Sequence, residues 1–393
     1  MAVVSLKQAT RLGRAFLTRN VPVYAHFGVT HRCDLTCKMC GIWRYGNKKE
    51  ELSLEEIEVV AQRMARIGVV QVSLGGGEPF AREDLPEICK IFTSAGVNTR
   101  VLTNAVNVSE EKLRACLDAG VKNFSISLDS LYPERFDYIC EHEGSWVSAV
   151  RNMSFLANEL KGKGGLLVMN CVVSNLNMEE IPDIVRFAKA LGFAVSLLPI
   201  ELLPDAKAGV RNWEARFIRH RPEMGMVAGP QGDVATRVER TYSEILQMKK
   251  DGWPIFNSVP YLKASRDYLK TGRFPAEGCD AGRLYFSISP NGQFTICHRA
   301  THGYRHILDD GFEEYFQSAE YEAKRMMEAG GCEGCMRACW IDTSSIFRTY
   351  EGFFGTVKQT LRPNTSAPCS PQEALSWARY DPLPEATGDA VAK

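Results

Sequence analysis

Short apolar runs, many of them rich in β-branched residues, alternate with longer amphipathic stretches through the first half of the chain. Parallel strands that are joined by helices produce this alternation. Six such units curve without closing a full barrel, so the pattern predicts an α/β fold, a partial (β/α)6 barrel similar to a TIM barrel. The runs predicted to be strands are residues 21–29, 69–74, 98–103, 123–128, 166–173 and 194–199.

Helix-start signals lie between these runs. Ser53 followed by Glu56 forms a capping box and predicts a helix over residues 53–67. Ser109 is expected to cap a helix over residues 109–119, and residues 177–191 have a helical apolar period. These helices are the expected crossovers between strands.

The alternation stops after the sixth predicted strand. The segment that follows carries helical and loop signals, at 213–221 and 235–250, and is predicted to cover the mouth of the barrel. The expected division is an N-terminal helix (1–20), the barrel (21–204), a helical connector (205–276), a small cysteine-rich β-hairpin and helix domain (277–345), and a C-terminal extension and tail (346–393).

Charge and cysteine content narrow the class of protein. The 47 basic and 47 acidic residues cancel, so no overall field favours nucleic acid as a partner. Thirteen cysteines, with no signal peptide and no apolar run as long as a bilayer span, predict a protein of the reducing cytoplasm whose thiols stay free for metal. Four cysteines inside periodic segments are expected in the core, namely Cys89, Cys116, Cys140 and Cys171.

Three cysteines, Cys33, Cys37 and Cys40, follow the first predicted strand. A loop at the end of that strand would bring three thiolates together, and three thiolates on a [4Fe–4S] cluster leave one iron open. A zinc site is the alternative, but it would need a fourth ligand, for which only His31 is near.

The spacing of these cysteines resembles that of the radical S-adenosylmethionine (radical SAM) enzymes, and Gly75-Gly76-Gly77-Glu78-Pro79 at the end of the second strand strengthens the resemblance. The resemblance implies that the open iron binds SAM and that one electron from the cluster cleaves SAM to methionine and a 5′-deoxyadenosyl radical. It also implies that Gly76, Gly77, Glu78 and Pro79 meet the amino group of SAM. A plain tight turn is the alternative for the glycines.

Further polar residues stand at the ends of later strands. They serve either the binding site or only the turns; the resemblance implies contacts with the ribose or carboxylate of SAM, and adenine contacts near Pro199. Two positions depart from the family: Met39 stands where an aromatic residue is common, and the usual arginine is replaced, which leaves Arg135 as a candidate partner of the SAM carboxylate. The strand-end candidates are Thr103, Asn104, Ser127, Asp129, Asn170 and Ser174.

A second group of cysteines predicts an auxiliary metal site. Cys279 and Cys297 flank a hairpin-like stretch in which Asn291-Gly292 is expected to form a two-residue turn. The pattern resembles the SPASM domain and its shorter twitch form, which implies one auxiliary [4Fe–4S] cluster; two clusters or a structural zinc remain alternatives. The implied ligands are Cys279, Cys297, Cys332 and Cys335, and Cys339 and Cys369 are left over.

These resemblances imply an enzyme that abstracts a hydrogen atom from its substrate and passes an electron to the auxiliary cluster. The expected reductant is a protein such as flavodoxin or ferredoxin. The substrate is a peptide, a protein or a small molecule, and the segment before Cys33 is too short for a fused leader-binding domain. The general base or radical donor stays open among Cys140, Cys339, Tyr285 and His298.

Two other functions stay open. The predicted N-terminal helix carries Lys7, Arg11 and Arg14 on one face, so it either plugs the bottom of the barrel or makes a peripheral contact with a membrane that holds a lipid substrate. A cluster protein that only transfers electrons is the second alternative. The open iron and the glycine-rich strand end argue against it.

Overall fold

The computed structural model describes residues 6–45, 51–200, 232–275, 278–297, 300, 303–360 and 369–380. Within them the strands form one sheet in the order β6-β5-β4-β3-β2-β1-β7-β8, in which all neighbours except β7 and β8 are parallel. The strands are β1 Tyr24–Thr30, β2 Gln71–Gly76, β3 Asn98–Thr103, β4 Asn123–Ser127, β5 Leu166–Val173, β6 Ala194–Pro199, β7 Tyr285–Ile288 and β8 Phe294–Thr295.

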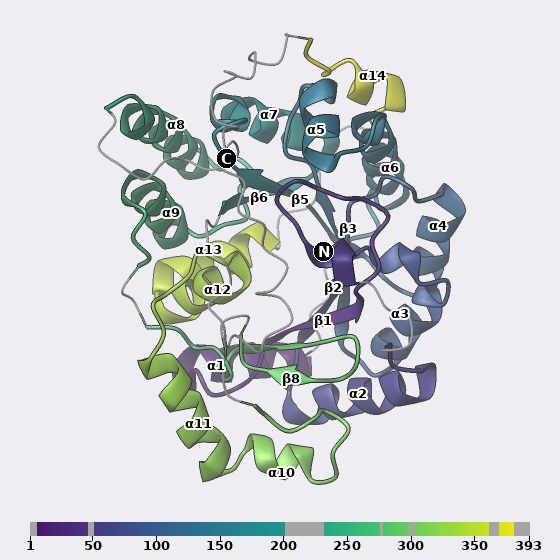
Figure 1. The fold of residues 1–393 in the computed structure, drawn as a ribbon, viewed down its shortest axis with the longest axis vertical. Helices are drawn as coiled ribbons and strands as arrows, with labels where there is room; N and C mark the ends of the chain where they lie inside the picture. The colour runs from purple at the N-terminus through teal and green to yellow at the C-terminus, as the bar shows by residue number, and fades with distance from the viewer. Residues whose placement is uncertain are drawn as a thin grey trace, which may run out of the picture.

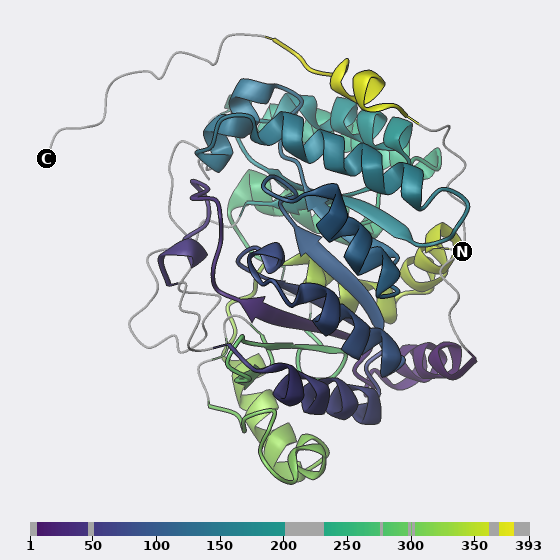
Figure 2. The same cartoon turned by 90° about the vertical axis from the view of Figure 1, so that its right-hand side faces the viewer.

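Helices connect the first six strands, which confirms the predicted α/β barrel. Figure 1 shows α2, α3, α4 and α6 along one side of the sheet and α9, α12 and α13 on the other, and Figure 2 looks onto the first group with the strands behind it. The helices are α1 Leu6–Thr18, η1 Ile42–Tyr45, α2 Leu54–Ile67, η3 Pro79–Ala81, α3 Leu85–Ser94, α4 Glu110–Asp118, α5 Pro133–Cys140, α6 Ser145–Glu159, η4 Met178–Glu180, α7 Ile181–Leu191, α8 Gly232–Lys250, α9 Val259–Thr271, α10 Phe312–Phe316, α11 Ala319–Gly330, α12 Ala338–Arg348, α13 Tyr350–Thr360 and α14 Pro371–Leu375.

The caps that start the helices agree with the sequence. Ser53 and Glu56 form the expected capping box at α2, and the Ser109 side chain accepts from the Lys112 amide at the start of α4. The helix predicted over 177–191 is divided into η4 and α7, with a proline in the first turn of α7. The predicted helix 235–250 is confirmed as part of α8, whereas 213–221 lies outside the described residues.

The two faces of the sheet differ in polarity. Phe27, Leu74 and Val101 are register partners, and the Phe27 ring lies 5.9 Å from that of Phe92 on α3, so this row faces the side of the sheet that carries α3. Side chains alternate along a strand, so the neighbouring positions face the barrel interior. Along β1 to β4, the interior side of the sheet carries most of the polar side chains, and the side of α2, α3, α4 and α6 carries most of the apolar ones.

The hairpin β7–β8 belongs to the same sheet, because β7 pairs in parallel with β1. The Gly292 amide donates to the Ser289 carbonyl at 2.9 Å and Gly292 has φ of +81°, so Pro290 and Asn291 are the central residues of the turn. The expected two-residue Asn291-Gly292 turn is therefore wrong: Pro290 favours the second position of a type I turn, and the glycine takes the left-handed position after it.

The helix α1 packs against the amino-terminal end of the barrel. The Arg11 guanidinium donates to the Ala65 carbonyl at 2.9 Å near the end of α2, and the Gln8 amide donates to the Gly96 carbonyl just before β3. In the part of the chain that the structure describes, no helix is both long enough and apolar enough to cross a bilayer.

Candidate active site

The three N-terminal cysteines lie in the loop that follows β1. The Cys40 amide donates to the Cys37 carbonyl at 3.0 Å, and a charge on Cys37 would act on both Cys33 and Cys40. Burial raises the pKa of Cys33 and of Cys40, so these thiols hold their protons until a cation replaces them. A metal cluster supplies such a positive charge, which is why the donor set fits one.

The carboxyl end of α5 closes over this loop. The Lys38 amide donates to the Ile139 carbonyl at 2.9 Å, and the Lys38 ammonium lies 4.2 Å from the centre of the Tyr138 ring. A hydrogen bond with Cys140, together with burial, raises the pKa of Cys37. The prediction that Cys89, Cys116, Cys140 and Cys171 are buried is confirmed, but Cys140 also contacts the cysteine loop.

The glycine-rich segment after β2 packs directly on the backbone that leads into the cysteine loop. The Gly77 amide donates to the Thr30 carbonyl and the Glu78 amide to the Arg32 carbonyl, both at 2.8 Å. A Cβ atom at Gly77 would lie 2.0 Å from the Arg32 oxygen, and one at Gly76 would lie 2.1 Å from the Thr30 oxygen. Only glycine fits at either position, because the two loops touch through their main chains.

The Glu78 carboxylate is buried and fixed by the end of β3. Its two oxygens accept from the Thr103 hydroxyl and from the Asn104 amide, each at 2.8 Å. Burial raises the pKa of Glu78 to about 7. The Asn104 side chain also donates to Asp34 at 2.8 Å, so Thr103 and Asn104 join Glu78 to the cysteine loop.

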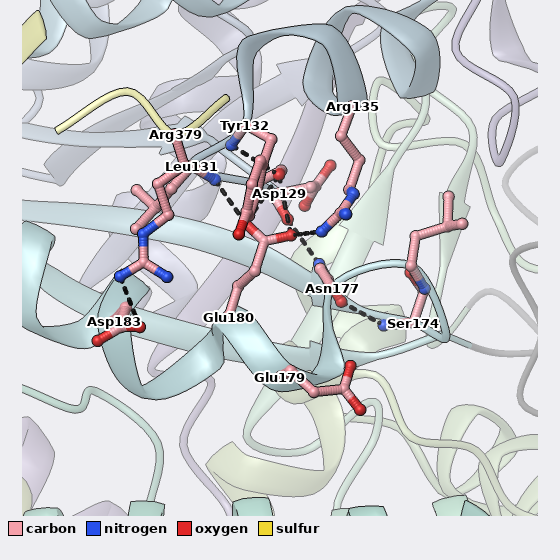
Figure 3. A network of polar contacts seen from close by, with 12 residues as sticks. Asp129, Leu131, Tyr132, Arg135, Ser174, Asn177, Glu179, Glu180, Asp183 and Arg379 are labelled. Carbon is pink, nitrogen blue, oxygen red and sulfur yellow. Dashed lines mark hydrogen bonds and ion pairs between the residues drawn. The ribbon is translucent and has the colours of Figure 1, made fainter. Parts of the chain in front are cut away.

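A buried polar network lies beyond β4 (Figure 3). One Asp129 oxygen accepts from the Val172 amide at 2.7 Å, and the Asp129 carbonyl accepts from Asn177 at 2.6 Å. Burial raises the pKa of Asp129 to about 7. Asn177 in turn accepts from the Ser174 amide at 2.8 Å, so this network holds the ends of β4 and β5 together.

Arg135 lies in the same network, where its guanidinium forms an ion pair with the buried carboxylate of Glu180. Figure 3 shows Glu180 between Arg135 and the Leu131 backbone, whose amide donates to it at 2.8 Å. Arg135 therefore has an internal carboxylate partner, and the sequence argument for it as the cation of the SAM carboxylate did not foresee Glu180.

A row of polar residues crosses β4, β5 and β6. Ser127 pairs with Asn170, and Asn170 pairs with Ser196. Partners in parallel strands share a face, so the two predicted residues are neighbours. Ser196 is a member that the sequence analysis missed, although its position within β6 gives the same alternation signal.

The four predicted ligands of the C-terminal site come from three separate segments. The Cys279 sulfur lies 2.8 Å from the Tyr285 hydroxyl, and charges on Cys332 and Cys335 would act on Cys279 and Tyr285 respectively. Cys297 lies at the end of the hairpin, beside the Ile296 carbonyl that accepts from Trp340 of α12 at 3.3 Å. The structure thus places Cys279 and Cys335 near Tyr285, and Cys332 near Cys279.

Two leftover cysteines differ in position. Cys339 lies in the first turn of α12. Cys369 lies elsewhere: its carbonyl accepts from Ser154 of α6 at 2.7 Å, and it precedes α14, which Figure 1 shows at the top. His298, the remaining radical-donor candidate, lies outside the described residues.

Arg337, which lies two residues after Cys335, acts electrostatically on the N-terminal cysteine loop. Burial is the main cause that raises the pKa of Cys40, and the positive charge of Arg337 acts in the opposite direction. Among the described residues no three His, Cys, Asp or Glu side chains converge tightly enough to grip a single metal ion. In a [4Fe–4S] cluster each cysteine binds a different iron, so its thiols lie farther apart than the ligands of a single metal ion.

Comparisons with known proteins agree with this geometry. Residues 28–188 match the Radical SAM superfamily. The chain is 30% identical over 327 residues to PqqA peptide cyclase of Rhizobium meliloti (strain 1021), covering 82% of this chain and 74% of that protein. It is 33% identical over 175 residues to GTP 3′,8-cyclase of Aquifex aeolicus (strain VF5), covering 43% of this chain and 54% of that protein.

A solved structure shares the fold. Streptococcus suis SuiB superposes with a TM-score of 0.57 at 14% identity, covering 88% of this chain and 78% of SuiB. At that identity the likeness concerns the fold alone. It confirms the partial α/β barrel.

Proposed function

The chain belongs to the radical SAM superfamily, and from that premise we propose that it oxidises a peptide substrate at an unactivated carbon. When bound, a [4Fe–4S] cluster and SAM supply the 5′-deoxyadenosyl radical that abstracts the substrate hydrogen atom. One observation carries the proposal. The backbone that leads into the loop of Cys33, Cys37 and Cys40 accepts hydrogen bonds from the Gly77 and Glu78 amides at the carboxyl end of the sheet.

The residues of this loop and its neighbours take distinct roles. The three thiolates hold the cluster. The backbone of Gly76, Gly77 and Pro79 and the carboxylate of Glu78 face the amino group of SAM, with Thr103 and Asn104 fixing Glu78. Asp129 and Ser174 hold the strand ends, and Ser127 and Asn170 face the ribose or carboxylate from the interior.

An apolar group is the proposed place of the adenine. Met39 packs with Val172 and Leu176 against Ile139 and Ile200, next to Pro199. Met is polarizable and flexible, so it can lie on a flat ring in place of an aromatic side chain.

The auxiliary site is proposed to hold one [4Fe–4S] cluster on Cys279, Cys297, Cys332 and Cys335. A cluster held there would supply an acceptor for the electron that the substrate radical loses, so that the substrate would be oxidised by two electrons in total. Arg337, two residues after Cys335, supports this role, because its charge acts on Cys40 of the N-terminal loop. Cys339 is the proposed further ligand if the protein holds a second auxiliary cluster.

A peptide is favoured as substrate because the peptide cyclase relative matches over 82% of this chain, whereas the GTP cyclase relative matches over 43%. A nucleotide or other small molecule is the second candidate. The proposed reductant is flavodoxin or ferredoxin, and the proposed compartment is the cytoplasm. The packing of α1 on Ala65 and Gly96 favours a barrel plug over a membrane contact.

The test uses the reconstituted protein without oxygen, with dithionite and SAM, and measures 5′-deoxyadenosine. Extract from cells that make this protein, grown in deuterated medium, is divided into a peptide fraction and a small-metabolite fraction. Deuterium that enters 5′-deoxyadenosine only with the peptide fraction, and not after protease treatment, supports the proposal. Transfer from the small-metabolite fraction favours the second candidate, and no 5′-deoxyadenosine at all contradicts both.

A further inference from the structure

A row of five polar side chains crosses the interior of the barrel below the SAM site. The register pairs Ser287 with His26, His26 with Ser73, Ser73 with Arg100 and Arg100 with Asn123, across β7, β1, β2, β3 and β4. These partners share one face of the sheet. The alternate row through Phe27 faces α3, so the polar row faces the opposite side, which is the barrel interior.

Arg100 is the only cation of this row, and it is nine-tenths buried with 9% of its surface exposed. Among the described residues no carboxylate pairs with it, and its Nε atom has no hydrogen-bond partner. Its guanidinium carbon lies 5.4 Å from the centre of the Phe256 ring. Within the described part of the chain, the charge of Tyr24 would act on Arg100, and a tyrosine is neutral near pH 7.

Ser73 is the neighbour of Arg100 in the row and repeats the same feature. It is 1% exposed, and its hydroxyl has no partner among the described residues. Its other neighbour, His26, lies 3.3 Å from the Ser287 hydroxyl through Nδ1. Two adjacent buried donors on one face of the sheet, the Ser73 hydroxyl and the Arg100 Nε, thus have no hydrogen-bond acceptor among the described residues.

Buried charges in proteins are paired or hydrogen-bonded, because removing an ion from water is costly. A planar guanidinium binds a carboxylate through two parallel hydrogen bonds, and a serine hydroxyl beside it adds a third. The pair of Ser73 and Arg100 therefore has the donors for one carboxylate and lacks the acceptor.

We propose that Arg100 and Ser73 form a subsite for a carboxylate of the substrate, inside the barrel and below SAM. This inference rests on the proposed function and names the substrate class more closely, as a molecule with a free carboxylate near the reacting carbon. Arg100 lies three residues before Thr103, so it is nearer the barrel floor than Glu78 and the cysteine loop. The flat Phe256 ring holds the guanidinium in place across the interior.

The first experiment detects the anion site without turnover. Crystals of the reconstituted protein, with and without SAM, are soaked in sodium bromide and measured at the bromine edge. We expect an anomalous peak within hydrogen-bonding distance of Arg100 and Ser73 that persists with SAM. No peak overturns the proposal, and a peak that SAM displaces assigns the site to the carboxylate of SAM instead.

The second experiment uses the substrate found by deuterium transfer, as the free acid and as the amide at each carboxyl group. The wild type is expected to favour one free carboxylate by about 10- to 100-fold in kcat/KM, and Arg100→Met to lose that preference through KM. Ser73→Ala is expected to reduce the preference for the free carboxylate as well. This variant still tests the subsite if Arg100→Met fails to fold. Arg114→Met, on an exposed surface pair with Glu159, is the control that keeps the preference. An unchanged preference in both interior variants contradicts the subsite, whereas absence of 5′-deoxyadenosine in the wild type contradicts the proposed function.

Discussion

The two cysteine regions are built in different ways. Cys33, Cys37 and Cys40 share one loop, which is tied by backbone hydrogen bonds to Gly77 and Glu78 on one side and to Ile139 on the other. The C-terminal cysteines arrive from separate segments. Cys279 precedes β7, Cys332 and Cys335 follow α11, and the Tyr285 side chain lies beside the Cys279 sulfur.

This difference separates a site that the main chain preorganises from one that tertiary packing assembles. The C-terminal region relies on pairs such as Arg348 with Asp280, at 2.7 and 3.0 Å, next to Cys279. Chemistry that must hold SAM in one orientation suits the first kind of site, and an electron acceptor tolerates the second.

The largest expected effect comes from removing the ligands of the first region. Cys33/Cys37/Cys40→Ala should lower 5′-deoxyadenosine formation by more than about 100-fold, because loss of groups that merely orient ligands already costs 10- to 100-fold. Chromatography of the quenched reaction measures it. Retained SAM cleavage in this variant would show that the cluster sits elsewhere.

The matched change in the second region should spare SAM cleavage. In Cys279/Cys332→Ala, 5′-deoxyadenosine formation should stay within about tenfold of the wild type, since the altered ligands belong to a separate site. Oxidised product should disappear, because the electron of the substrate radical has no acceptor. Mass spectrometry of the substrate checks this, and normal product formation would remove the electron-accepting role.

The pH dependence of stability tests whether Glu78, beside the N-terminal cysteine loop, is buried as the structure shows. Its folded pKa of about 7 lies above its ordinary value of 4.5, so the native state holds this proton longer than the unfolded state does. Stability from this group is present below pH 4.5 and is lost as pH rises through 7, by on the order of 3 kcal/mol. Urea unfolding of the metal-free, reduced protein at pH 5 to 8 should therefore show a steeper fall for the wild type than for Glu78→Gln. Parallel curves would mean that Glu78 is not desolvated; Asp129 contributes equally to both proteins.

Gly77→Ala should have the smallest effect of the four. The new Cβ would lie 2.0 Å from the Arg32 carbonyl oxygen, so the loop must shift, at a loss of about 1–3 kcal/mol. 5′-Deoxyadenosine formation should fall with it. Gly13→Ala is the control, because nothing lies within 4 Å of its Cβ in the helix α1, and it should stabilise by about 0.5–1 kcal/mol. Equal melting temperatures for the two variants would contradict the close contact.

The local patterns predicted the barrel well. Apolar runs and capping residues located the six strands and the starts of α2 and α4, because such signals act over a few residues. The hairpin turn was misplaced by one position, since Pro290 competes with Gly292 for control of the turn. The attachment of β7 to β1 could not be predicted, because it joins segments more than 250 residues apart.

The candidate site was predictable as far as its ligands share a motif. Glu180 as the partner of Arg135, Cys140 beside Cys37, and Arg337 near Cys40 are contacts between distant segments, and no spacing encodes them. The interior row with Arg100 and Ser73 was missed because each strand contributes one polar residue, which becomes meaningful only once the register is known.

Iron content measured in three proteins tests the central claim most directly, that two independent cluster sites exist. The wild type, Cys33/Cys37/Cys40→Ala and Cys279/Cys332→Ala are reconstituted without oxygen, and iron and sulfide are counted. The account predicts about eight irons in the wild type and about four in each variant. About four irons in the wild type, lost entirely in one variant and unchanged in the other, would contradict it.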